Sequence, residues 1–328
     1  MKQPDFLIRL QPVIGRIDQA MRADIAQVDS PVLREVLEYA IFNGGKRIRP
    51  LLTLLAAELC GMPAGDGDAC RLAMLFEYLH AASLLHDDVV DSSEVRRGRA
   101  AANLVWGNPA AILAGDFLHA RAMRLAGVVG GLRCLEIVSQ ATNAMVEAEF
   151  LQMANAGAPN LTEDDYFRVL QGKTAALIGA ACEVGAVYAQ AAPEQGAALR
   201  HYGENLGLAF QVVDDLLDYW GDPQSTGKAV GNDFVEGKMT LPLIHAVRQA
   251  TVDEQRLVAE LLAADGNARR QRLAEVTALI EANGGLAYSR ERAAGLVRDA
   301  QDELRKFAAG EAGSLLAALA DYVLTRRK

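Results

Sequence analysis

The sequence predicts an all-α fold, a single large bundle of roughly a dozen helices around a deep central cavity. Three observations support this prediction. Alanine and leucine dominate the 328 residues while aromatic residues make up only 6%, which favours helix over sheet. No stretch alternates convincingly at the period of two that marks strands. Hydrophobic residues make up 51%, enough for a sizeable core, and we expect one domain over residues 1–328.

The N-terminal elements begin and end at clear signals. Residues 5–28 have the spacing of a helix, and Ser30-Pro31 offers an N-cap followed by a proline at the first position of a second helix. Asn43-Gly44-Gly45 ends that helix near Phe42. Lys46, Arg47 and Arg49 then open the next helix, where cations oppose the helix dipole unless an anion binds. The alternative is a basic loop in solvent.

A first aspartate motif ends the helix predicted over residues 68–91. Asp87 and Asp91 are four residues apart, so they share a helix face at about 6 Å with Asp88 beside them. Two like charges at that distance favour a bound cation, and carboxylate oxygens without clustered thiols or imidazoles favour Mg²⁺. The following Arg96-Arg97 pair suits phosphate oxygens. A solvated acidic face followed by a basic one is the alternative.

The middle of the chain continues as helices separated by loops. We expect a loop over 92–108, a helix from Asn108-Pro109, and a further helix over 130–154. After a loop at 155–160, Thr162 and Asp165 form a pattern close to a capping box at the start of another helix.

A second aspartate motif lies on the helix predicted over 194–220. Asp214, Asp215 and Asp218 repeat the spacing of the first motif, and Gln211 lies on nearly the same face as Asp214. One such motif is a weak signal, but two on apolar helices are strong, since facing helices could hold metal ions bridged by a polyphosphate. A glycine-rich loop over 221–239 follows and carries the cations Lys228 and Lys238, with Asp233 between them.

The remaining helices show no site. They are predicted over 252–264, 268–283, 286–308 and 312–325, with charges typical of solvated faces, and the closing Arg326-Arg327-Lys328 is interpreted as a frayed basic tail.

Composition excludes several classes of protein. A net charge of −9 argues against nucleic acid as a partner. The four cysteines lack CxxC spacing and are expected to be reduced thiols. The N-terminus has no signal-peptide pattern and no stretch is long and apolar enough to span a bilayer, so we expect a cytoplasmic protein.

These motifs resemble one family. GGKRIRP at 44–50, the two aspartate motifs and LPLIHA at 241–246 resemble the trans-isoprenyl diphosphate synthases, the polyprenyl synthetases, nearly from end to end. Their details are most similar to octaprenyl diphosphate synthases that make quinone side chains. The resemblance implies a helical bundle of the isoprenoid synthase type and an enzyme that joins isopentenyl diphosphate to an allylic diphosphate, which we expect to be farnesyl diphosphate. It also implies a homodimer.

The resemblance assigns roles to individual residues. It implies Mg²⁺ as the cofactor, with three ions when substrate is bound, held directly by Asp87, Asp91 and Asp214. It places isopentenyl diphosphate on Lys46, Arg49, His80 and Arg97. It places the allylic diphosphate on Arg96, Lys173, Thr174, Gln211, Lys228 and Lys238. The catalytic set it implies is Asp87, Asp88, Asp91, Asp214, Asp215, Asp218, Lys173 and Lys228.

Small residues one turn before the first motif bear on product length. Short-chain members of the family often have an aromatic floor there, whereas this chain has Ala82 and Ser83. The cavity is therefore expected to be open and the product long. We expect a C40 octaprenyl product, although solanesyl or decaprenyl fits equally well, and a shorter-chain synthase is the alternative.

Three other functions compete with the synthase. His86-Asp87 resembles the dyad of a metal phosphohydrolase, but that reading leaves the second motif without a role. A non-catalytic, prenyl diphosphate-binding regulatory subunit would usually lack one aspartate motif, and both are intact. A terpene cyclase would lack the GGKR element and would use Asn and Ser or Thr in its second motif.

Overall fold

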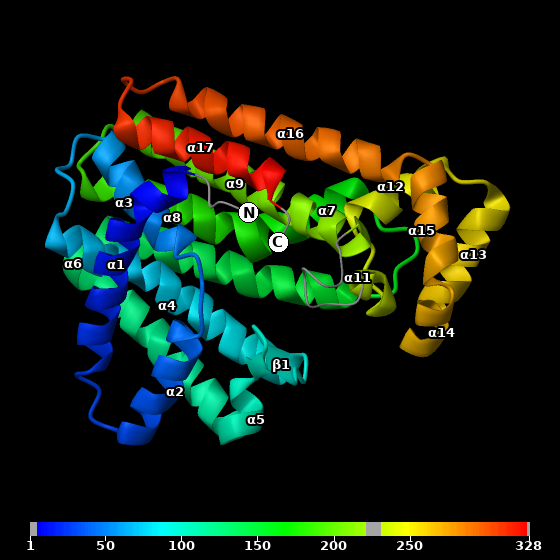
Figure 1. Cartoon of the computed structure of the whole chain (residues 1–328), viewed down its shortest axis with the longest axis horizontal. Coiled ribbons are helices and arrows are strands. Elements are labelled where there is room, and N and C mark those ends of the chain that lie inside the picture. The colour runs from blue at the N-terminus through cyan, green and yellow to red at the C-terminus, as the bar shows by residue number, and fades with distance from the viewer. Residues whose placement is uncertain (1–4, 221–230, 327–328) are drawn as a thin grey trace. The chain divides into compact units, whose positions relative to one another are not determined.

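The computed structural model describes residues 5–220 and 231–326, which are almost entirely helical (Figure 1). The predicted all-α fold is confirmed. Across these residues, no helix is both long and apolar enough to cross a membrane. The chain divides into two compact units, one of Met1–Gln140, Ala180–Arg200 and Lys306–Leu316, and the other of Ala141–Gly179, His201–Arg305 and Ala317–Lys328. We call them unit 1 and unit 2; the single domain remains a prediction.

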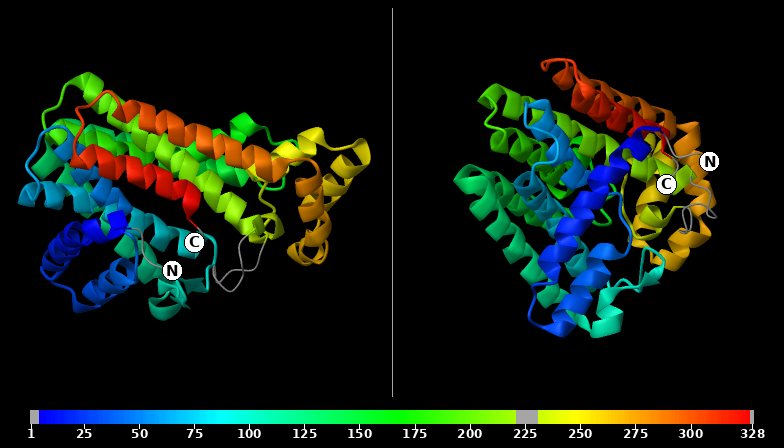
Figure 2. Two further views of the ribbon diagram at one scale, coloured as in Figure 1. Left: turned by 45° about the horizontal axis from the view of Figure 1, so that its top comes forward. Right: turned by 60° about the vertical axis from the view of Figure 1, so that its left-hand side comes forward.

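Unit 1 is organised around one buried helix. The helix α4 contacts α1, α2, α3 and the short α5 (Figures 1 and 2). Its apolar side chains are buried on nearly every face, and Phe76 and Tyr78 are among the largest fully buried side chains of the protein. The first aspartate motif is thus carried by the central helix of the unit. The N-terminal elements are α1 (Asp5–Ile25), α2 (Pro31–Phe42), α3 (Ile48–Leu59), α4 (Gly67–Val90) and α5 (Ala102–Trp106).

Predicted start and stop signals are present in the structure. The Ser30 hydroxyl caps α2 by accepting a hydrogen bond from the Leu33 amide at 3.3 Å. Gly44 and Gly45, with φ of 82° and 126°, form the turn after α2 that the paired glycines predicted. The long helix α6 (Asn108–Asn155) has a kink at Gly131 (φ 78°, ψ −175°), close to the boundary expected near residue 130.

Three local expectations were wrong. The loop expected over 221–239 contains the short helix α11 (Asn232–Val235). The segment expected as a loop over 92–108 contains α5 and a two-stranded hairpin, β1 (Val95–Arg96) and β2 (Arg99–Ala100), in which Arg96 pairs with Arg99. Strands this short cannot show an alternating pattern, so the sequence gives no strand signal. The single helix expected over 268–283 is interrupted at Arg272, where φ is −108° and ψ is 13°.

In unit 2, α12 is the central element of the C-terminal helices. It contacts α7, α13, α15 and α16 (Figure 1). A side chain at Gly285 would clash with the Pro242 carbonyl oxygen, so glycine permits the close approach of α16 to α12. The elements after α6 are α7 (Glu163–Leu170), the π-helical turn η1 (Gln171–Ala175), α8 (Ala176–Tyr188), α9 (Pro193–Trp220), α11 (Asn232–Val235), α12 (Leu241–Gln249), α13 (Val252–Ala263), α14 (Gly266–Gln271), α15 (Leu273–Ala282), α16 (Gly285–Leu304) and α17 (Glu311–Thr325).

Candidate active site

The first aspartate motif lies at the C-terminal end of α4 in unit 1. Asp91 is the C-cap, and its amide donates to the Asp87 carbonyl at 2.8 Å, so the two residues are one helical turn apart. Asp91 is exposed and Asp87 is part-buried. Negative charge at a helix C-terminus opposes the helix dipole, and a like charge one turn away adds to the cost. The pair therefore favours a cation, as the sequence predicted.

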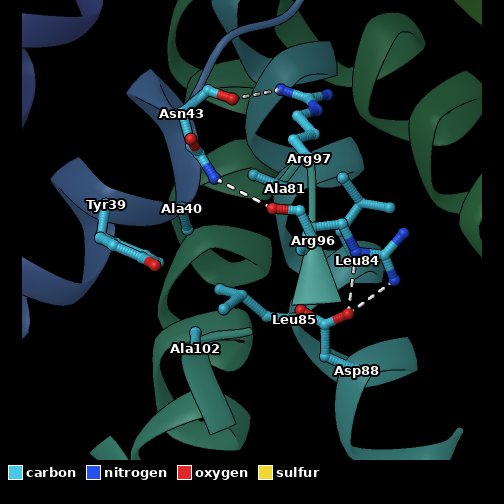
Figure 3. A pocket seen from close by; sticks show the side chains of 10 residues that line it. All are labelled: Tyr39, Ala40, Asn43, Ala81, Leu84, Leu85, Asp88, Arg96, Arg97 and Ala102. Atoms are coloured by element: carbon cyan, nitrogen blue, oxygen red, sulfur yellow. Dashed lines mark hydrogen bonds and ion pairs between the residues drawn. The ribbon is translucent and has the colours of Figure 1, made fainter. Parts of the chain in front are cut away.

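Asp88 is directed the other way, into the protein. Its side chain is 4% exposed, and its Oδ1 accepts hydrogen bonds from Nε and Nη2 of Arg96 at 2.8 and 2.6 Å (Figure 3). The Asn103 side chain donates to the Asp88 carbonyl at 3.1 Å. The hairpin missed by sequence analysis positions Arg96 for this contact. In this structure Asp88 and Arg96 therefore bind each other, and Asp87 and Asp91 are the carboxylates of the motif that face outward.

A concentration of positive charge surrounds His80 in unit 1. Burial lowers the pKa of His80 well below its usual value, and the neighbouring guanidinium groups of Arg49 and Arg97 lower it further, as do Arg96 and Arg47. The Nε of Arg49 is buried without a hydrogen-bond partner among the described residues. Burial also lowers the pKa of Arg49 and of Arg97. This environment is suited to a phosphate group.

Arg47 has a different role from its two basic neighbours. It is buried and donates to Glu77 and Asp18, both at 2.7 Å. Burial opposes its charge, but these two carboxylates together raise its pKa. In the sequence Arg47 is one of three cations, with Lys46 and Arg49, that open the helix. In the structure its contacts with Glu77 and Asp18 hold the turn before α3 in place.

The absence of a side chain at Gly45 leaves room for the guanidinium groups of Arg47 and Arg97. A Cβ atom built there would lie 2.9 Å from Nη1 of Arg47 and 3.0 Å from Nη1 of Arg97. Arg97 itself donates to the carbonyl of Gly44 and reaches that of Asn43 at 3.5 Å (Figure 3). The hairpin and the glycine turn thus bring Arg97 to the α2–α3 junction, next to the residues predicted to bind isopentenyl diphosphate. Lys46 is exposed at the same turn.

Figure 3 shows the small cavity between these elements. Its volume is about 20 Å³, the space of one water molecule, and it is lined by residues of α2, α4, the hairpin and α5. Its lining residues include the Asp88–Arg96 pair and also Asn43, which contacts the backbone of Arg96 and the side chain of Arg97. It is too small to hold a substrate.

The predicted chain-length residues also lie on α4. Ala82 is buried, and the part-buried Ser83 donates its hydroxyl to the His80 carbonyl at 2.9 Å. His86 packs against Gly115 of α6, and its Nε2 lies 3.2 Å from the Ile112 carbonyl oxygen.

In unit 2, the three aspartates of the second motif have three different environments. Asp214 is 41% exposed and contacts Arg326. Asp215 is buried and accepts hydrogen bonds from the Tyr166 hydroxyl at 2.6 Å and the Gln211 amide at 3.0 Å. Asp218 accepts from the backbone amides of residues 232 and 233, at 3.2 and 3.0 Å, at the start of α11. Asp214 therefore keeps a partly exposed carboxylate, while Asp215 and Asp218 are already hydrogen-bonded within the protein.

Asp215 and Asp233 are two acidic residues that line the same cavity, whose volume is about 280 Å³. Burial raises the pKa of Asp215 to about 7, and the charge of Asp233 raises it further. The hydrogen bonds from Tyr166 and Gln211 oppose this increase. A carboxyl group whose pKa is raised by burial and by a neighbouring negative charge is stabilised in its ionised form by a nearby cation or cationic side chain. The cavity is lined on its polar side by Lys173, Gln211, Asp215, Asp233, Glu236 and Lys238.

The cations of this cavity are paired with carboxylates. Lys173 lies on η1, a type of helical insertion that is frequent at functional sites, and its Nζ is 2.7 Å from Glu149 of α6. Lys238 is 2.7 Å from Glu236 and 3.9 Å from Asp233. Thr174, also on η1, donates to Gln211 at 3.4 Å. A diphosphate entering the cavity would compete with these carboxylates for the lysines.

The predicted site residue Lys228 lies outside the described residues.

The interpretation of Arg326 as part of a frayed tail was wrong. Its side chain is 3% exposed, contacts Asp214 and stacks on Phe210, with its Cζ 3.8 Å from the ring centroid. Burial lowers the pKa of Arg326 to about 10. No helical pattern marks a residue that follows the last helix, so the sequence carries no signal for this contact.

The donors fit a hard divalent cation. No group of three or more His, Cys, Asp or Glu side chains within residues 5–220 and 231–326 is arranged as a complete metal site. Mg²⁺ does not need one, because it takes one or two carboxylates and completes its coordination with water and phosphate oxygens. The outward-facing Asp87 and Asp91 of unit 1 and the exposed Asp214 of unit 2 are oxygen donors of that kind.

Comparisons with known proteins cover most of the chain. Residues 30–280 match the family described as polyprenyl synthetase. Octaprenyl diphosphate synthase of Escherichia coli (strain K12) is 40% identical over 291 residues, which cover 85% of this chain and 88% of that protein. A short chain isoprenyl diphosphate synthase of Methanothermobacter thermautotrophicus is 38% identical over 315 residues, which cover 94% of this chain and 95% of that protein.

Solved structures agree with the sequence matches. A decaprenyl diphosphate synthase from Rhodobacter capsulatus has a TM-score of 0.89 and 39% identity, with 98% of each chain covered. A polyprenyl synthase from Caulobacter crescentus, complexed with calcium and isoprenyl diphosphate, has a TM-score of 0.89 and 38% identity, with 99% of this chain and 98% of that chain covered.

Proposed function

The chain belongs to the polyprenyl synthetase family and is a prenyl diphosphate synthase, and we propose that it joins isopentenyl diphosphate head-to-tail to farnesyl diphosphate and makes a C40 octaprenyl diphosphate for quinone side chains. The observation that carries this proposal is that both aspartate motifs present an accessible carboxylate, Asp87 and Asp91 on α4 and Asp214 on α9. A regulatory subunit without catalysis would not need both.

In unit 1, the basic residues around His80 would bind isopentenyl diphosphate. Lys46, Arg49 and Arg97 bring positive charge, and the lowered pKa of His80 leaves a neutral imidazole whose N–H can donate to a phosphate oxygen. Arg49 has a buried Nε that needs an acceptor, which a diphosphate supplies. Arg47, held by Glu77 and Asp18, keeps the turn in place.

In unit 2, the cavity beside the second motif would bind the allylic diphosphate. Lys173, Thr174, Gln211 and Lys238 donate to its oxygens, and we propose the same for Arg96 of unit 1 and for Lys228. Mg²⁺, held by Asp87, Asp91 and Asp214, would supply Lewis-acid stabilisation of the leaving group when bound, with three ions expected. The lysines add electrostatic stabilisation as the C–O bond ionises.

Carbon–carbon bond formation needs few protein groups. The double bond of isopentenyl diphosphate attacks the allylic carbocation, and the resulting cation loses a proton to form the new double bond. We propose that the departing diphosphate takes this proton, because the sequence offers no obvious general base and the diphosphate leaves beside the new cation. The protein's task is to hold both substrates and to keep water from the cation.

The octaprenyl product is proposed from the names of similar proteins and from two small side chains of α4. The names of the similar proteins include octaprenyl, decaprenyl and short-chain synthases. The small side chains of Ala82 and Ser83 favour a long product, because neither can act as a floor for the growing tail. A shorter-chain synthase is the alternative.

We also propose that the enzyme is a homodimer, and its exposed apolar residues support this. In unit 2, Val146, Phe150 and Met153 follow one face of α6 and are 58%, 67% and 53% exposed. In unit 1, Ile112 and Leu113 of the same helix are also exposed. A long helix with apolar residues in solvent is suited to contact with a second copy. A cytoplasmic location remains a prediction.

The test is an incubation of the purified full-length protein with Mg²⁺, labelled isopentenyl diphosphate and farnesyl diphosphate. The products are dephosphorylated and sized by chromatography and mass spectrometry. A C40 product is expected. A product that stops at C20 would keep the reaction but replace the octaprenyl assignment with the shorter-chain one. Folded protein that elongates no allylic primer would overturn the synthase and favour the regulatory subunit.

A further inference from the structure

A chain of hydrogen bonds in unit 2 joins three side chains that line the cavity, and it begins at Tyr166 of α7. The Tyr166 hydroxyl donates to Oδ2 of Asp215 at 2.6 Å, and Nε2 of Gln211 donates to Oδ1 of the same carboxylate at 3.0 Å. The Thr174 hydroxyl donates to Oε1 of Gln211 at a longer 3.4 Å. Each Asp215 oxygen therefore has one donor, and the Gln211 amide is held at both its nitrogen and its oxygen.

This chain fixes which way the Gln211 amide faces. With Asp215 ionised, turning the amide over would place its carbonyl oxygen against the carboxylate, where two acceptors repel each other. One N–H of the amide is used by Asp215, and no described residue accepts the second. Because Gln211 lines the cavity, the second N–H is available to an acceptor that enters it. The fixed amide is thus suited to an anionic oxygen.

Tyr166 controls the other end of the chain. Its ring is buried and packs edge-on against Phe167, with centroids 5.2 Å apart. Its helix begins at the capping box of Thr162 and Asp165 and runs directly into η1. The hydroxyl is therefore held by backbone structure rather than by a mobile loop, and it prevents the Asp215 carboxylate from rotating away from Gln211.

We propose that Tyr166 is a positioning residue for the allylic diphosphate: it fixes Asp215, and through Asp215 it directs the second N–H of Gln211 toward an oxygen of that substrate. This inference rests on the proposed function, because it concerns the substrate of that reaction. Tyr166 acts through Gln211 and not by its own contact with the diphosphate.

The first test separates the two Michaelis constants. Tyr166→Phe is expected to raise KM for farnesyl diphosphate about tenfold, the loss of one oriented hydrogen bond to a charged group, and to leave KM for isopentenyl diphosphate within about twofold. Tyr288→Phe is the matched control, because the Tyr288 hydroxyl also donates to a carboxylate at 2.6 Å, that of Glu163, but Tyr288 does not line the cavity. Equal changes in both constants, or the same change in the control, would overturn the proposal.

A double-mutant cycle tests the route through Gln211. In a Gln211→Leu background, adding Tyr166→Phe should raise KM for farnesyl diphosphate by less than about twofold, because the amide it positions is gone. Independent, multiplying effects would contradict the proposal. If Tyr166→Phe does not fold, Tyr166→Met, which removes the same hydroxyl and keeps an apolar side chain, replaces it in the same cycle.

Two further measurements distinguish a failure of the proposed reaction from a failure of the positioning role of Tyr166. Wild-type elongation is measured first, and its absence would count against the synthase and not against the hydrogen-bond chain. Binding of farnesyl thiolodiphosphate, which resists ionisation, is then measured by calorimetry with the same variants. A selective loss of affinity in Tyr166→Phe supports the positioning role, and unchanged affinity overturns it.

Discussion

The buried carboxylate of Asp88 receives both of its side-chain hydrogen bonds from one residue, Arg96, through Nε at 2.8 Å and Nη2 at 2.6 Å (Figure 3). The pair joins the last turn of α4 to the hairpin after it. A buried charge with a single partner is costly when that partner is lost. The middle residue of the first aspartate motif therefore has a structural partner, while its neighbours face outward.

Replacing Arg96 should destabilise the protein. Arg96→Ala leaves the Asp88 carboxylate without its donors, and we expect the free energy of unfolding to fall by about 2 kcal/mol, since Arg96 is itself about one-third exposed and water compensates in part. Denaturant unfolding measures this. Arg99→Ala on the partner strand is the control and should change stability by less than about 0.5 kcal/mol. Equal stability of the two variants would show that the pair contributes nothing.

The three aspartates of the first motif should differ in how much each contributes to metal binding. Asp87→Asn and Asp91→Asn should lower elongation roughly a hundredfold or more, because each removes a proposed Mg²⁺ ligand. Binding of Mn²⁺ in the presence of farnesyl thiolodiphosphate, followed by electron paramagnetic resonance, should weaken in both. Chelation with EDTA should abolish activity, and Mg²⁺ should restore it. If Asp88→Asn weakened Mn²⁺ binding as much as Asp87→Asn, the division between outward and inward carboxylates would be incorrect.

His80 should make stability depend on pH below neutrality. Burial and the nearby Arg49 and Arg97 lower the pKa of His80 in the folded state, so the unfolded chain binds a proton more readily. This contribution to stability is fully present above the unfolded pKa of about 6.5 and is lost as pH falls toward the folded pKa, by up to about 1.4 kcal/mol per pH unit.

Unfolding measured between pH 7.5 and 5 tests this, with His80→Gln as the variant that should remove part of the slope. His119→Gln, at an exposed position on α6, is the matched control and should leave the slope unchanged. A wild-type slope identical to that of His80→Gln would contradict the buried environment.

Product length should respond to bulk on α4. Ala82→Phe should shorten the product sharply if the tail passes this position, and Ser83→Phe tests the neighbouring residue, which lies one turn before Asp87. Because Ala82 is buried, the phenylalanine also costs about 1–3 kcal/mol of stability through overpacking. Folding is therefore checked by thermal unfolding before products are sized. An unchanged product from a folded Ala82→Phe enzyme would show that the tail follows another path.

Helices and their ends were predictable because their signals are local. The Ser30 cap, the glycines at 44 and 45, and the capping box at Thr162 each act within four residues of themselves. The charged motifs were equally visible, since each is a short run on one helix. The hairpin at 95–100 was missed because two-residue strands are too short to show a period.

Contacts between distant segments could not be predicted in the same way. Glu77 is 30 residues from Arg47, and Tyr166 is 49 residues from Asp215. In the sequence Glu77 and Tyr166 are ordinary helical residues, and only the packing of the elements reveals that each holds another residue in place. The tertiary structure therefore adds the residues that position the site, while the sequence shows those that are expected to bind ligands.

Arg326 should compete with metal ions for Asp214. The guanidinium is buried over Phe210 and contacts Asp214, and with a pKa lowered only to about 10 it stays positively charged near pH 7.5. A divalent cation that binds Asp214 must displace this contact. Arg326→Met keeps an apolar side chain against Phe210 and removes the charge, so we expect the enzyme without substrates to bind Mn²⁺ about five- to tenfold more tightly, a change of about 1–1.4 kcal/mol.

Electron paramagnetic resonance titration of free Mn²⁺ measures this affinity. Arg305→Met, which removes an exposed arginine paired with Asp302, is the control for the change in net charge and should have almost no effect. Because Asp214 is itself 41% exposed, solvent compensates for the lost contact, and the unfolding temperature should change little. Weaker Mn²⁺ binding in Arg326→Met would mean instead that Arg326 holds Asp214 in the orientation that a metal ion needs.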